Sequence, residues 1–461
     1  MADSKGKEMY RKQHKQVLQL FEKGLQAVAP ERALCENMFV HNGKLHVGQR
    51  VYDLAENRRI WVFGSGKAAG RMALEAERIL NRHIYDGIVI CPYGLKTKTR
   101  RIQQFEAAHP VPDLNSLTAT YEMLDVAGDV QPADLVLFLM SGGSSSLLCM
   151  PHDDVELDEL RVLYRELLLC GMPIAEMNRV RTSFSKVKGG GLREVMGRAM
   201  VEVLVISDVP GNDPAVIGSG PLTAVPVSAA ESLELLCQYD VDKRIPQSLI
   251  RFLHKQTVSQ SVCLAPSTQT ETTPTPSTRT LSDFPTEMTL LASAEKLAAI
   301  IAEEAQALGY NTFVHDAYLI GEARRAARTI AARAVDVLAR NQPVARPAAL
   351  IYYGETTVNV TGDGKGGRNQ ELALSAAIAL EGQHYITLLS AGTDGRDGTT
   401  GAAGALCTAQ TGLHARSLGM APEDYLERND SYSFFSKAGG LLVTGLTGNN
   451  LMDIHLVLVD K

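Results

Sequence analysis

Short apolar runs recur along the first half of the chain, and turns rich in glycine or serine follow them. The runs at residues 60–63, 134–140 and 201–206 have the length and the bounds of strands buried in a sheet. Helical patterns lie between them, at about residues 71–80 and 114–130. Strands that alternate with helices predict an α/β fold, in which ligands bind at the carboxyl ends of the strands.

The same pattern returns in the second half, after a change in composition. Residues 255–280 are dominated by Ser, Thr, Gln and Pro, so they cannot bury enough apolar surface to order themselves. We therefore predict an N-terminal domain at residues 1–254, a linker or surface insertion at 255–284 and a C-terminal domain at 285–461. The second domain is predicted to contain strands at 287–292, 311–315, 348–353, 384–389, 440–445 and 454–459, and helices at 295–308, 322–340 and 369–380.

A glycine-rich turn at residues 354–371 separates a predicted strand from a predicted helix and carries Lys365 and Arg368. Glycine allows backbone N–H groups to approach a ligand closely, and a helix N-terminus adds positive potential. The guanidinium of Arg368 is a fork suited to phosphate or carboxylate oxygens. The turn favours anion binding, with a flexible hairpin and solvated charges as the alternative.

A second turn, at residues 64–70, follows the first predicted strand and contains Lys67. Its Gly-x-Gly-x-x-x-Gly spacing misses the dinucleotide fingerprint by one residue, and it is not a Walker A loop. Lys67 nevertheless favours an anion site over a merely tight connection. The candidate ligand-binding residues of this turn are Gly64, Ser65 and Gly66.

A third turn, Ser141-Gly-Gly-Ser-Ser-Ser, follows the strand at residues 134–140 and clusters backbone amides and hydroxyls without charge. It can form a nest for a small anion such as a carboxylate. No Gly-x-Ser-x-Gly elbow surrounds these serines, which argues against a hydrolase nucleophile. Residues 177–191 add basic side chains, although cations are also common at a helix C-terminus. The candidate binding residues here are Ser141, Gly142, Gly143, Ser144, Ser145, Lys186 and Lys188.

Acidic residues follow other buried strands. Asp208, Asp394 and Glu355 stand at the carboxyl ends of predicted strands, where α/β enzymes place metal-binding or catalytic acids. An Asp in a Pro-Gly turn is also ordinary turn chemistry. We predict Asp208 and Asp394 as metal ligands or as the general base, and the sequence does not assign which. His109 precedes a proline, where histidine is more often structural than a proton shuttle.

Composition adds bounds to this interpretation. The chain has 461 residues, of which 45% are hydrophobic and 21% charged, enough for two or three ordinary globular domains. A net charge of -6 and a pI of about 6.0 argue against nucleic-acid binding. The seven cysteines form no Cys-x-x-Cys pair, which favours a reducing compartment. Without a long apolar run or signal core, the protein is expected to be cytoplasmic, with no membrane span and with a mitochondrial location less favoured.

Both halves thus carry a basic residue in a glycine-rich turn together with acids at strand ends. Phosphoryl transfer needs this mixture, because cations and amides bind phosphate oxygens while carboxylates hold Mg²⁺. When the parts are distributed over two domains, they suit a cleft that closes on two substrates and excludes water.

Six ordered motifs resemble the signatures of one family, the glycerate 2-kinases of the MOFRL class. They are FGSGKAAGRMA, HPVPD, SGGSSSLL, SDVPGNDP with IGSGP, GETTV with GGRNQEL, and SAGTDGRDG. The resemblance spans nearly the whole chain. It implies an N-terminal Rossmann-like three-layer domain, a smaller C-terminal α/β (MOFRL) domain and an active site in the interdomain cleft. It also implies phosphorylation of D-glycerate to 2-phosphoglycerate with ATP and Mg²⁺.

By the same resemblance, the family's catalytic lysine and arginine correspond to Lys67 and Arg368. Its acids correspond to Asp208, Glu355 and Asp394. Further candidate binding residues are Asn212 and Asn369.

The chain departs from the family pattern in three places. Ala292-Ser-Ala294 stands where the family often has an Asn that contacts nucleotide or substrate. Tyr353-Gly354 replaces a common Gly-Gly pair, and the insertion at residues 255–280 is atypical.

Two other functions remain open. An NAD(P)H-dependent hydroxypyruvate reductase would act on a related substrate, but the turn at residues 64–70 lacks the fingerprint spacing and no acid is placed to bind a ribose. A non-catalytic anion-binding protein of the same fold would bind these ligands without forming ADP. The expected partners are ATP and D-glycerate, and the expected state is a monomer or a homodimer.

Overall fold

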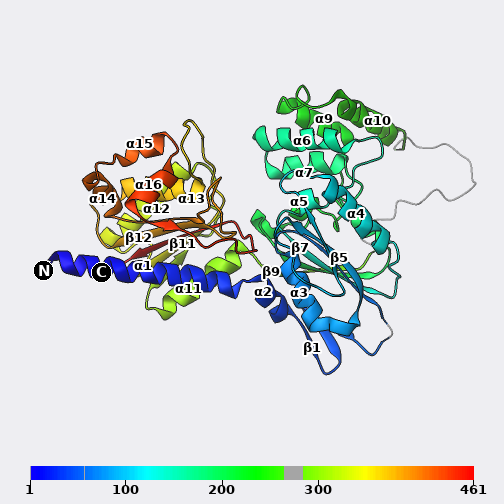
Figure 1. The fold of residues 1–461 in the computed structure, drawn as a ribbon, viewed down its shortest axis with the longest axis horizontal. Coiled ribbons are helices and arrows are strands. Elements are labelled where there is room, and N and C mark those ends of the chain that lie inside the picture. The colour runs from blue at the N-terminus through cyan, green and yellow to red at the C-terminus, as the bar shows by residue number, and fades with distance from the viewer. Residues whose placement is uncertain (1, 57, 264–283, 461) are drawn as a thin grey trace, which may run out of the picture. The chain divides into compact units, whose positions relative to one another are not determined.

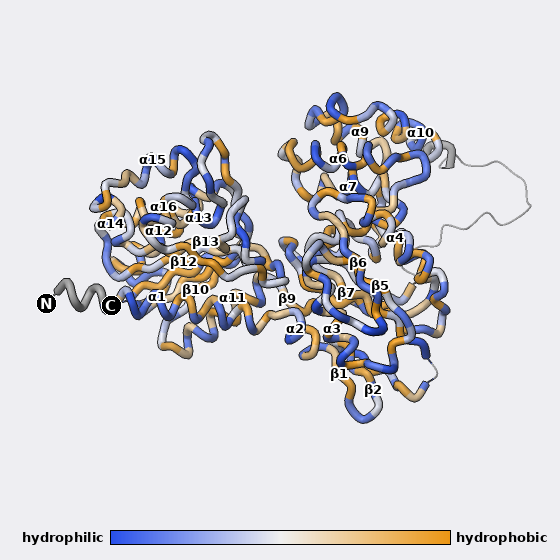
Figure 2. The backbone as a smooth tube through the Cα atoms, viewed as in Figure 1, coloured by the Kyte–Doolittle hydropathy of each residue, from blue (hydrophilic) through white to orange (hydrophobic). Residues whose placement is uncertain are grey.

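The computed structural model describes residues 2–56, 58–263 and 284–460. The chain forms two compact units: unit 1 comprises residues 1–33 and 292–461, and unit 2 comprises residues 34–291. In each unit, hydrophobic strands form the centre and helices surround them (Figures 1 and 2). The predicted α/β class is therefore confirmed.

Unit 2 is built on a six-stranded sheet with the strand order β6-β5-β4-β7-β8-β9. β4 pairs in parallel with β5 on one side and with β7 on the other, and the β5–β6 and β7–β8 pairs are also parallel. This is a Rossmann-like order, in which the winding direction reverses between β4 and β7. The strands are β4 (Ile60–Ser65), β5 (Ile84–Pro92), β6 (Gln103–Ala107), β7 (Leu135–Ser141), β8 (Met200–Ile206) and β9 (Thr286–Ala292).

Helices of unit 2 form two groups. α3 (Ala69–Leu80) and α4 (Leu114–Ala127) pack on the sheet, whose core includes Trp61, Phe63 and Phe138. A helical layer with its own apolar core gathers near the serine-rich turn (Figure 1). Its helices are α6 (Leu157–Leu169), α7 (Ile174–Ser183), α9 (Ala229–Gln238) and α10 (Gln247–Cys263).

Smaller elements complete the described part of unit 2. A short antiparallel sheet, in the order β1-β2-β3, comes before the main sheet in sequence. The elements are α2 (Pro30–Asn37), which spans the boundary between the units, β1 (Met38–His41), β2 (Lys44–Val47), β3 (Arg50–Asp53), α5 (Ser144–Leu147) and α8 (Gly191–Val195), and the 3-10 turns are η1 (Asn81–His83), η2 (Pro210–Asn212) and η3 (Ile217–Ser219).

Unit 1 is built on a mixed six-stranded sheet with the order β10-β11-β15-β12-β13-β14. Only the β10–β11 pair is parallel, and the C-terminal strand β15 lies antiparallel between β11 and β12. The apolar pattern predicted β15 but not its central position, because periodicity does not encode strand order. The strands are β10 (Asn311–Val314), β11 (Ala348–Gly354), β12 (Ile386–Gly392), β13 (Gly404–Thr408), β14 (Leu441–Leu442) and β15 (Asp453–Val459).

Two helices of unit 1 approach each other closely through alanines. α12 (Ala323–Arg340) buries Ala327, Ala331 and Ala334 in the same core as α13 (Arg368–Ala379). Small side chains allow this close packing, which sets the position of Arg368 at the start of α13. The other helices are α11 (Ala294–Ala307), α14 (Thr411–Ser417), α15 (Pro422–Glu427) and α16 (Ser431–Ala438).

The first helix, α1 (Ala2–Ala27), belongs to unit 1, where it lies against α11 and β12 (Figure 1). Its Gln13 is buried, donates to the carbonyl of Tyr385 (3.0 Å) and accepts a bond from the hydroxyl of Thr387 (2.8 Å). A buried amide with both groups bonded fixes the helix on the sheet.

The compact units therefore divide the chain differently from the predicted domain limits. The predicted N-terminal domain includes α1, which packs in unit 1, and the predicted C-terminal domain includes β9, which pairs in the sheet of unit 2. The predicted linker begins within α10, and its part at residues 264–283 lies outside the described residues. Within the described ranges, no helix is long and apolar enough to cross a membrane.

Candidate active site

The turn after β4 packs directly against the turn after β7. The N–H of Lys67 donates to the carbonyl of Gly142 (2.9 Å), and the N–H of Ala68 donates to Oγ of Ser141 (3.0 Å). Gly66 has a φ of +130°, and a Cβ there would overlap Ser141. Glycine is required for this approach, so two predicted anion-binding turns lie together where the winding of the sheet reverses.

Three side chains lie around the Gly142–Gly143 pair. A Cβ on Gly142 would overlap the carboxylate of Asp208, which comes from the turn after β8. A Cβ on Gly143, whose φ is +91°, would lie 3.0 Å from Cδ2 of His109 and 3.6 Å from Cγ of Lys67. The glycines thus leave room for a cation, an imidazole and a carboxylate at the carboxyl edge of the sheet. Lys67 and Asp208 were predicted as site residues, and His109 was interpreted as a turn residue.

The serine-rich turn uses most of its hydroxyls internally. Oγ of Ser144 donates to the carbonyls of Ser65 and Ser141, at 2.7 Å each. Of the five predicted nest residues, Gly143 and Ser145 are partly exposed and the other three are buried. A ligand at this turn would therefore meet Gly143 and Ser145.

Other predicted binding residues of unit 2 are placed differently. Gly64 and Ser65 are buried within β4, and a Cβ on Gly64 would lie 2.6 Å from the carbonyl oxygen of Leu139. They shape the turn and present no side chain to a ligand. Asn212 lies half-buried in the turn after β8 with a φ of 55°, and its binding role stays a prediction.

The two predicted lysines have contrasting surroundings. Nζ of Lys188 is buried and donates to the carbonyls of Ser145 and Leu148, at 2.7 Å each. Burial lowers the pKa of Lys188 to about 7. Lys186 is exposed and forms an ion pair with the exposed Asp153. Lys188 therefore supports the serine-rich turn from the interior, whereas Lys186 lies at the surface.

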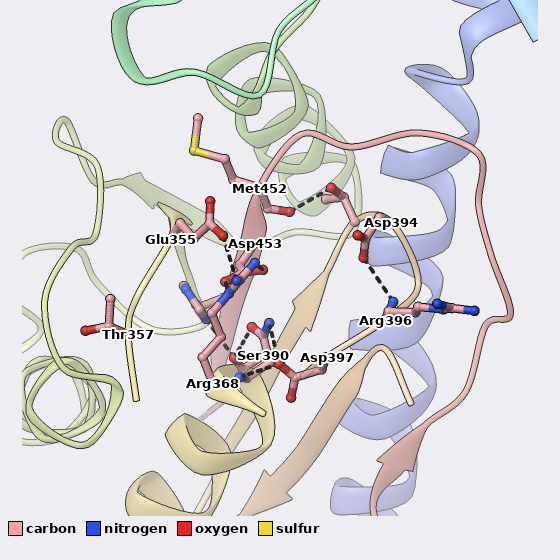
Figure 3. A network of polar contacts seen from close by, with 12 residues as sticks. Glu355, Thr357, Arg368, Ser390, Asp394, Arg396, Asp397, Met452 and Asp453 are labelled. Atoms are coloured by element: carbon pink, nitrogen blue, oxygen red, sulfur yellow. Dashed lines mark hydrogen bonds and ion pairs between the residues drawn. The ribbon is translucent and has the colours of Figure 1, made fainter. Parts of the chain in front are cut away.

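In unit 1, the guanidinium of Arg368 lies between two carboxylates (Figure 3). Nε and Nη2 donate to Asp453 at 2.5 and 3.0 Å, and Nη1 forms an ion pair with Glu355 at 2.6 Å. Burial alone would lower the pKa of Arg368, but Asp453 and Glu355 raise it above its usual range. Asp453 is fully buried and Glu355 is exposed. Glu355 is therefore the partner that an incoming anion can replace.

The N-terminus of α13 is capped by an acid from a neighbouring turn. The carboxylate of Asp397 accepts bonds from the N–H groups of Asn369 (3.0 Å) and Gln370 (2.8 Å). Burial raises the pKa of Asp397, while these N–H groups act in the opposite direction. The glycine-rich motif predicted a ligand at this helix end, and in the structure a carboxylate of the protein lies there.

Asn369 belongs to a buried chain of hydrogen bonds. Its Oδ1 accepts a bond from Oγ of Ser390 (2.7 Å), which lies 2.8 Å from Nδ1 of His455. Since the Ser390 proton points to Asn369, Nδ1 of His455 is the donor to Ser390. Burial lowers the pKa of His455 to about 4. The side chain of Asn369, predicted to bind ligand, is directed inward.

The glycine-rich turn before α13 borders a cavity. A Cβ on Gly362 or Gly364 would overlap the backbone of Arg428, so close packing on this segment explains these glycines. Nζ of Lys365 lies 4.6 Å from the ring centroid of Tyr432. The cavity measures about 620 Å³ and is lined in part by Glu355, Arg368 and Asn429. That volume suits a small-molecule ligand.

Asp394 lies in the turn after β12. Its Oδ1 accepts a bond from the N–H of Arg396 at 3.0 Å (Figure 3). Its carbonyl accepts a bond from the N–H of Thr447 at 3.2 Å, which ties this turn to the segment before β15.

Comparisons with known proteins cover both units. A domain of unknown function, DUF4147, matches residues 16–254, and the MOFRL family matches residues 348–453. The D-glycerate 2-kinase of Thermotoga maritima is 37% identical over 446 residues, which are 96% of this chain and 98% of that protein. The chain belongs to the glycerate 2-kinase family.

The similarity to glycerate 2-kinases extends to three dimensions. A crystal structure of glycerate kinase from Thermotoga maritima superposes with a TM-score of 0.81 at 36% identity, covering 97% of this chain and 100% of that one. A relative from Agrobacterium vitis, 35% identical over 403 residues and 87% of each chain, is provisionally named a hydroxypyruvate reductase. The family predicted from the sequence motifs is thus confirmed.

Asp208 and Asp394 are the candidate metal ligands of this glycerate 2-kinase family member. Among the described residues, no three His, Cys, Asp or Glu side chains gather into a metal-binding group. Asp208 and Asp394 each offer one carboxylate at the end of a strand. Mg²⁺ is usually held by one or two carboxylates together with waters and substrate phosphates, and either acid suits that arrangement.

Sequence reasoning missed Asp453, the buried partner of Arg368. A signal was present, because Asp453 and His455 are the only polar residues of the otherwise apolar β15. An acid in a strand that is buried along its whole length requires a partner. The missing information was which basic residue of the family motif lies beside that strand.

Proposed function

We propose that this protein transfers the γ-phosphoryl group of ATP to the 2-hydroxyl of D-glycerate, forming ADP and 2-phosphoglycerate. The observation that carries the proposal is the 37% identity to a D-glycerate 2-kinase over 96% of the chain. The chemistry of the site agrees with it, because phosphoryl transfer depends on positioned cations and carboxylates rather than on a covalent nucleophile.

In unit 2, Lys67 binds oxygens of the transferred phosphoryl group. It lies beside the glycine pair at the point of the sheet where ligands bind in this fold class. Asp208, across the same pair, either accepts the proton of the glycerate hydroxyl or holds Mg²⁺, and Asp394 takes the other role. When bound, Mg²⁺ neutralises charge on the phosphate oxygens.

In unit 1, Arg368 binds oxygens of a phosphate group. Asp453 holds one edge of the guanidinium, so its direction is fixed before the nucleotide arrives. The exposed Glu355 yields its place on Nη1 to a phosphate oxygen. This exchange replaces one anion by another at Nη1, while Asp453 remains paired with Nε and Nη2.

The carboxylate of D-glycerate binds at Gly143 and Ser145, the partly exposed positions of the serine-rich turn. Asn212, in the turn beyond Asp208, contributes a further polar contact. We assign the protein to the cytoplasm, as a monomer or a homodimer, and light scattering of the purified chain measures the second point.

Product identification tests the proposed function. The protein is incubated with ATP, Mg²⁺ and D-glycerate, ADP release is measured, and phosphorus NMR identifies the phosphoglycerate isomer. We expect ADP and 2-phosphoglycerate in equal amounts. Formation of 3-phosphoglycerate would contradict the proposed hydroxyl, and an absence of ADP with glycerate-induced stabilisation would identify a non-catalytic binder.

The name of the Agrobacterium relative makes hydroxypyruvate reduction the second candidate. The turn at residues 64–70 lacks the dinucleotide spacing, so we expect no loss of NADH absorbance with hydroxypyruvate. If NADH oxidation were faster than ADP release in parallel assays, hydroxypyruvate reduction would become the favoured function.

A further inference from the structure

Two cations of unit 2 are buried without a carboxylate partner. Arg181, on α7, is 5% exposed, and Lys188 is 4% exposed. In the part of the chain that the structure describes, no ion pair is formed by either side chain, and Nε of Arg181 has no hydrogen-bond partner. The guanidinium lies 4.6 Å from the ring centroid of Tyr164.

This arrangement is energetically unfavourable for the protein alone. Burial disfavours the charged forms and lowers the pKa of both Arg181 and Lys188. Buried charges are normally paired with an opposite charge, because desolvation is otherwise uncompensated. Arg193, the other fully buried arginine of unit 2, differs because carbonyls of Gly197, Ala199 and Pro285 accept its bonds.

The contacts of both cations converge on Ser145. Nζ of Lys188 donates to the carbonyl of Ser145 (2.7 Å). Nη1 of Arg181 lies 3.5 Å from Oδ1 of Asn178, which also accepts the hydroxyl of Ser219 (3.0 Å). The hydroxyl of Ser219 lies 3.0 Å from that of Ser145. Ser145 is also the member of this group that is partly exposed.

We infer that Arg181 and Lys188 are positioning residues that make the surface at Gly143 and Ser145 a receptor for the carboxylate of the acceptor substrate. The inference rests on the proposed function for the identity of that substrate. Arg181 supplies positive potential through Asn178 and Ser219, and Lys188 fixes the orientation of the Ser145 peptide. The bound carboxylate supplies the negative charge that the protein lacks at this place.

Asn178 and Ser219 transmit this effect by orienting the hydroxyl of Ser145. When Ser145 donates to a carboxylate instead of to Ser219, Ser219 still donates to Asn178, so the buried carbonyl of Asn178 keeps its bond. Three-carbon substrates with a carboxylate are therefore favoured over uncharged analogues of the same size.

The decisive experiment compares charged and uncharged ligands. D-glycerate and D-glyceramide, which differ only in the acid group, are titrated into the nucleotide-free protein by calorimetry. We expect wild type to bind D-glycerate more tightly by at least about tenfold. Arg181→Met is expected to reduce this ratio toward one, while Arg181→Lys retains part of it. A role limited to folding would weaken both ligands equally and would overturn the inference.

Arg179→Met is the matched control. Arg179 is two residues away on α7, exposed, and paired with Glu231 at the surface, so the ligand ratio is expected to stay at the wild-type value. Steady-state kinetics with Arg181→Met should show a raised KM for D-glycerate and an unchanged KM for ATP. An equal rise of both values would contradict a carboxylate receptor.

Ser219→Ala covers the case in which Arg181→Met does not fold. This smaller change leaves both cations in place, and we expect D-glycerate binding to weaken by about three- to tenfold with D-glyceramide unchanged. Unchanged D-glycerate binding would refute the inference. The two proposals separate clearly: a wild type that binds D-glycerate without forming ADP refutes only the kinase function, and an active enzyme with an unaltered ratio in Arg181→Met refutes only the receptor.

Discussion

The guanidinium of Arg368 and the carboxylate of Asp453 form a bidentate ion pair, at 2.5 and 3.0 Å, between the first residue of α13 and the first residue of β15. Asp453 is fully buried, whereas Arg368 is 32% exposed. The buried acid therefore sets the direction in which the exposed edge of the guanidinium points. Removal of Arg368 leaves the charge of the buried Asp453 unpaired, whereas removal of Asp453 leaves Arg368 with the exposed Glu355 alone.

Asp453→Asn tests this pair. The amide keeps the shape of the side chain but not its charge, so we expect the free energy of unfolding to fall by about 3 kcal/mol. Urea unfolding measures the change. Glu355→Gln is the control for stability, because its ion pair is exposed and should contribute less than about 1 kcal/mol. Equal effects of the two substitutions would contradict the assigned difference between the partners.

Loss of either predicted cation should abolish most of the turnover. Lys67→Ala and Arg368→Ala are each expected to lower kcat by on the order of 10³-fold, because each removes a charge that stabilises the transferred phosphoryl group. ADP release with D-glycerate is the measurement. Turnover within about threefold of wild type in both variants would show that neither residue serves the reaction.

Gly142→Ala tests whether Asp208 needs the space beside residue 142, since the substitution adds a side-chain atom there. The new Cβ would overlap the Asp208 carboxylate and displace it, so we expect kcat to fall by about 10²-fold or more. Gly401→Ala is a matched control, because its Cβ would meet no atom within 4 Å. Both variants should remain folded by circular dichroism. Normal turnover in Gly142→Ala would remove Asp208 from the reaction.

Asp394 and Asp397 lie in the same turn, and we expect one substitution to affect activity and the other to affect stability. Asp397 caps α13 through two N–H groups, so Asp397→Asn should lower the free energy of unfolding by about 1–2 kcal/mol. Asp394→Asn should instead lower kcat by about 10²-fold or more with little change in unfolding, because Asp394 is assigned to proton transfer or to Mg²⁺. If Asp397→Asn lowered kcat and Asp394→Asn lowered the free energy of unfolding, the roles assigned to the two residues would be wrong.

His455 should make stability depend on pH in a defined window. Its pKa is lowered from 6.5 to about 4 by burial, so the unfolded chain takes up the proton first as the pH falls. The stability that comes from burying a neutral imidazole is fully present above pH 6.5. As the pH falls from 6.5 to about 4, the free energy of unfolding decreases by about 3 kcal/mol in total.

Urea unfolding at several pH values compares wild type with His455→Gln. The variant should lose less stability across this window, and His41→Gln, at an exposed position of β1, should follow wild type. Identical slopes for wild type and His455→Gln would contradict a buried neutral imidazole.

The order in which strands alternate with helices was sufficient to predict an α/β fold and the position of Lys67 after a strand, and the family resemblance added the Rossmann-like sheet. Local pattern places a residue at the end of a strand, and the fold class then brings such ends to one edge. The partners of Arg368 could not be predicted, because Asp453 is 85 residues away in sequence and enters through a strand whose place in the sheet is set by long-range pairing. The inward direction of Asn369 could not be predicted for the same reason, since its partners Ser390 and Asp397 belong to β12 and to the turn after it.

The packing of α1 on unit 1 gives the polypeptide a nested connectivity, in which residues 34–291 form an insertion within a discontinuous outer module. During synthesis the inserted module is complete well before the ribosome reaches the central strand β15. Helix α1 is therefore synthesised long before strand β15, on whose sheet it packs. We expect the amides of the outer module to become protected from exchange only when both elements are present.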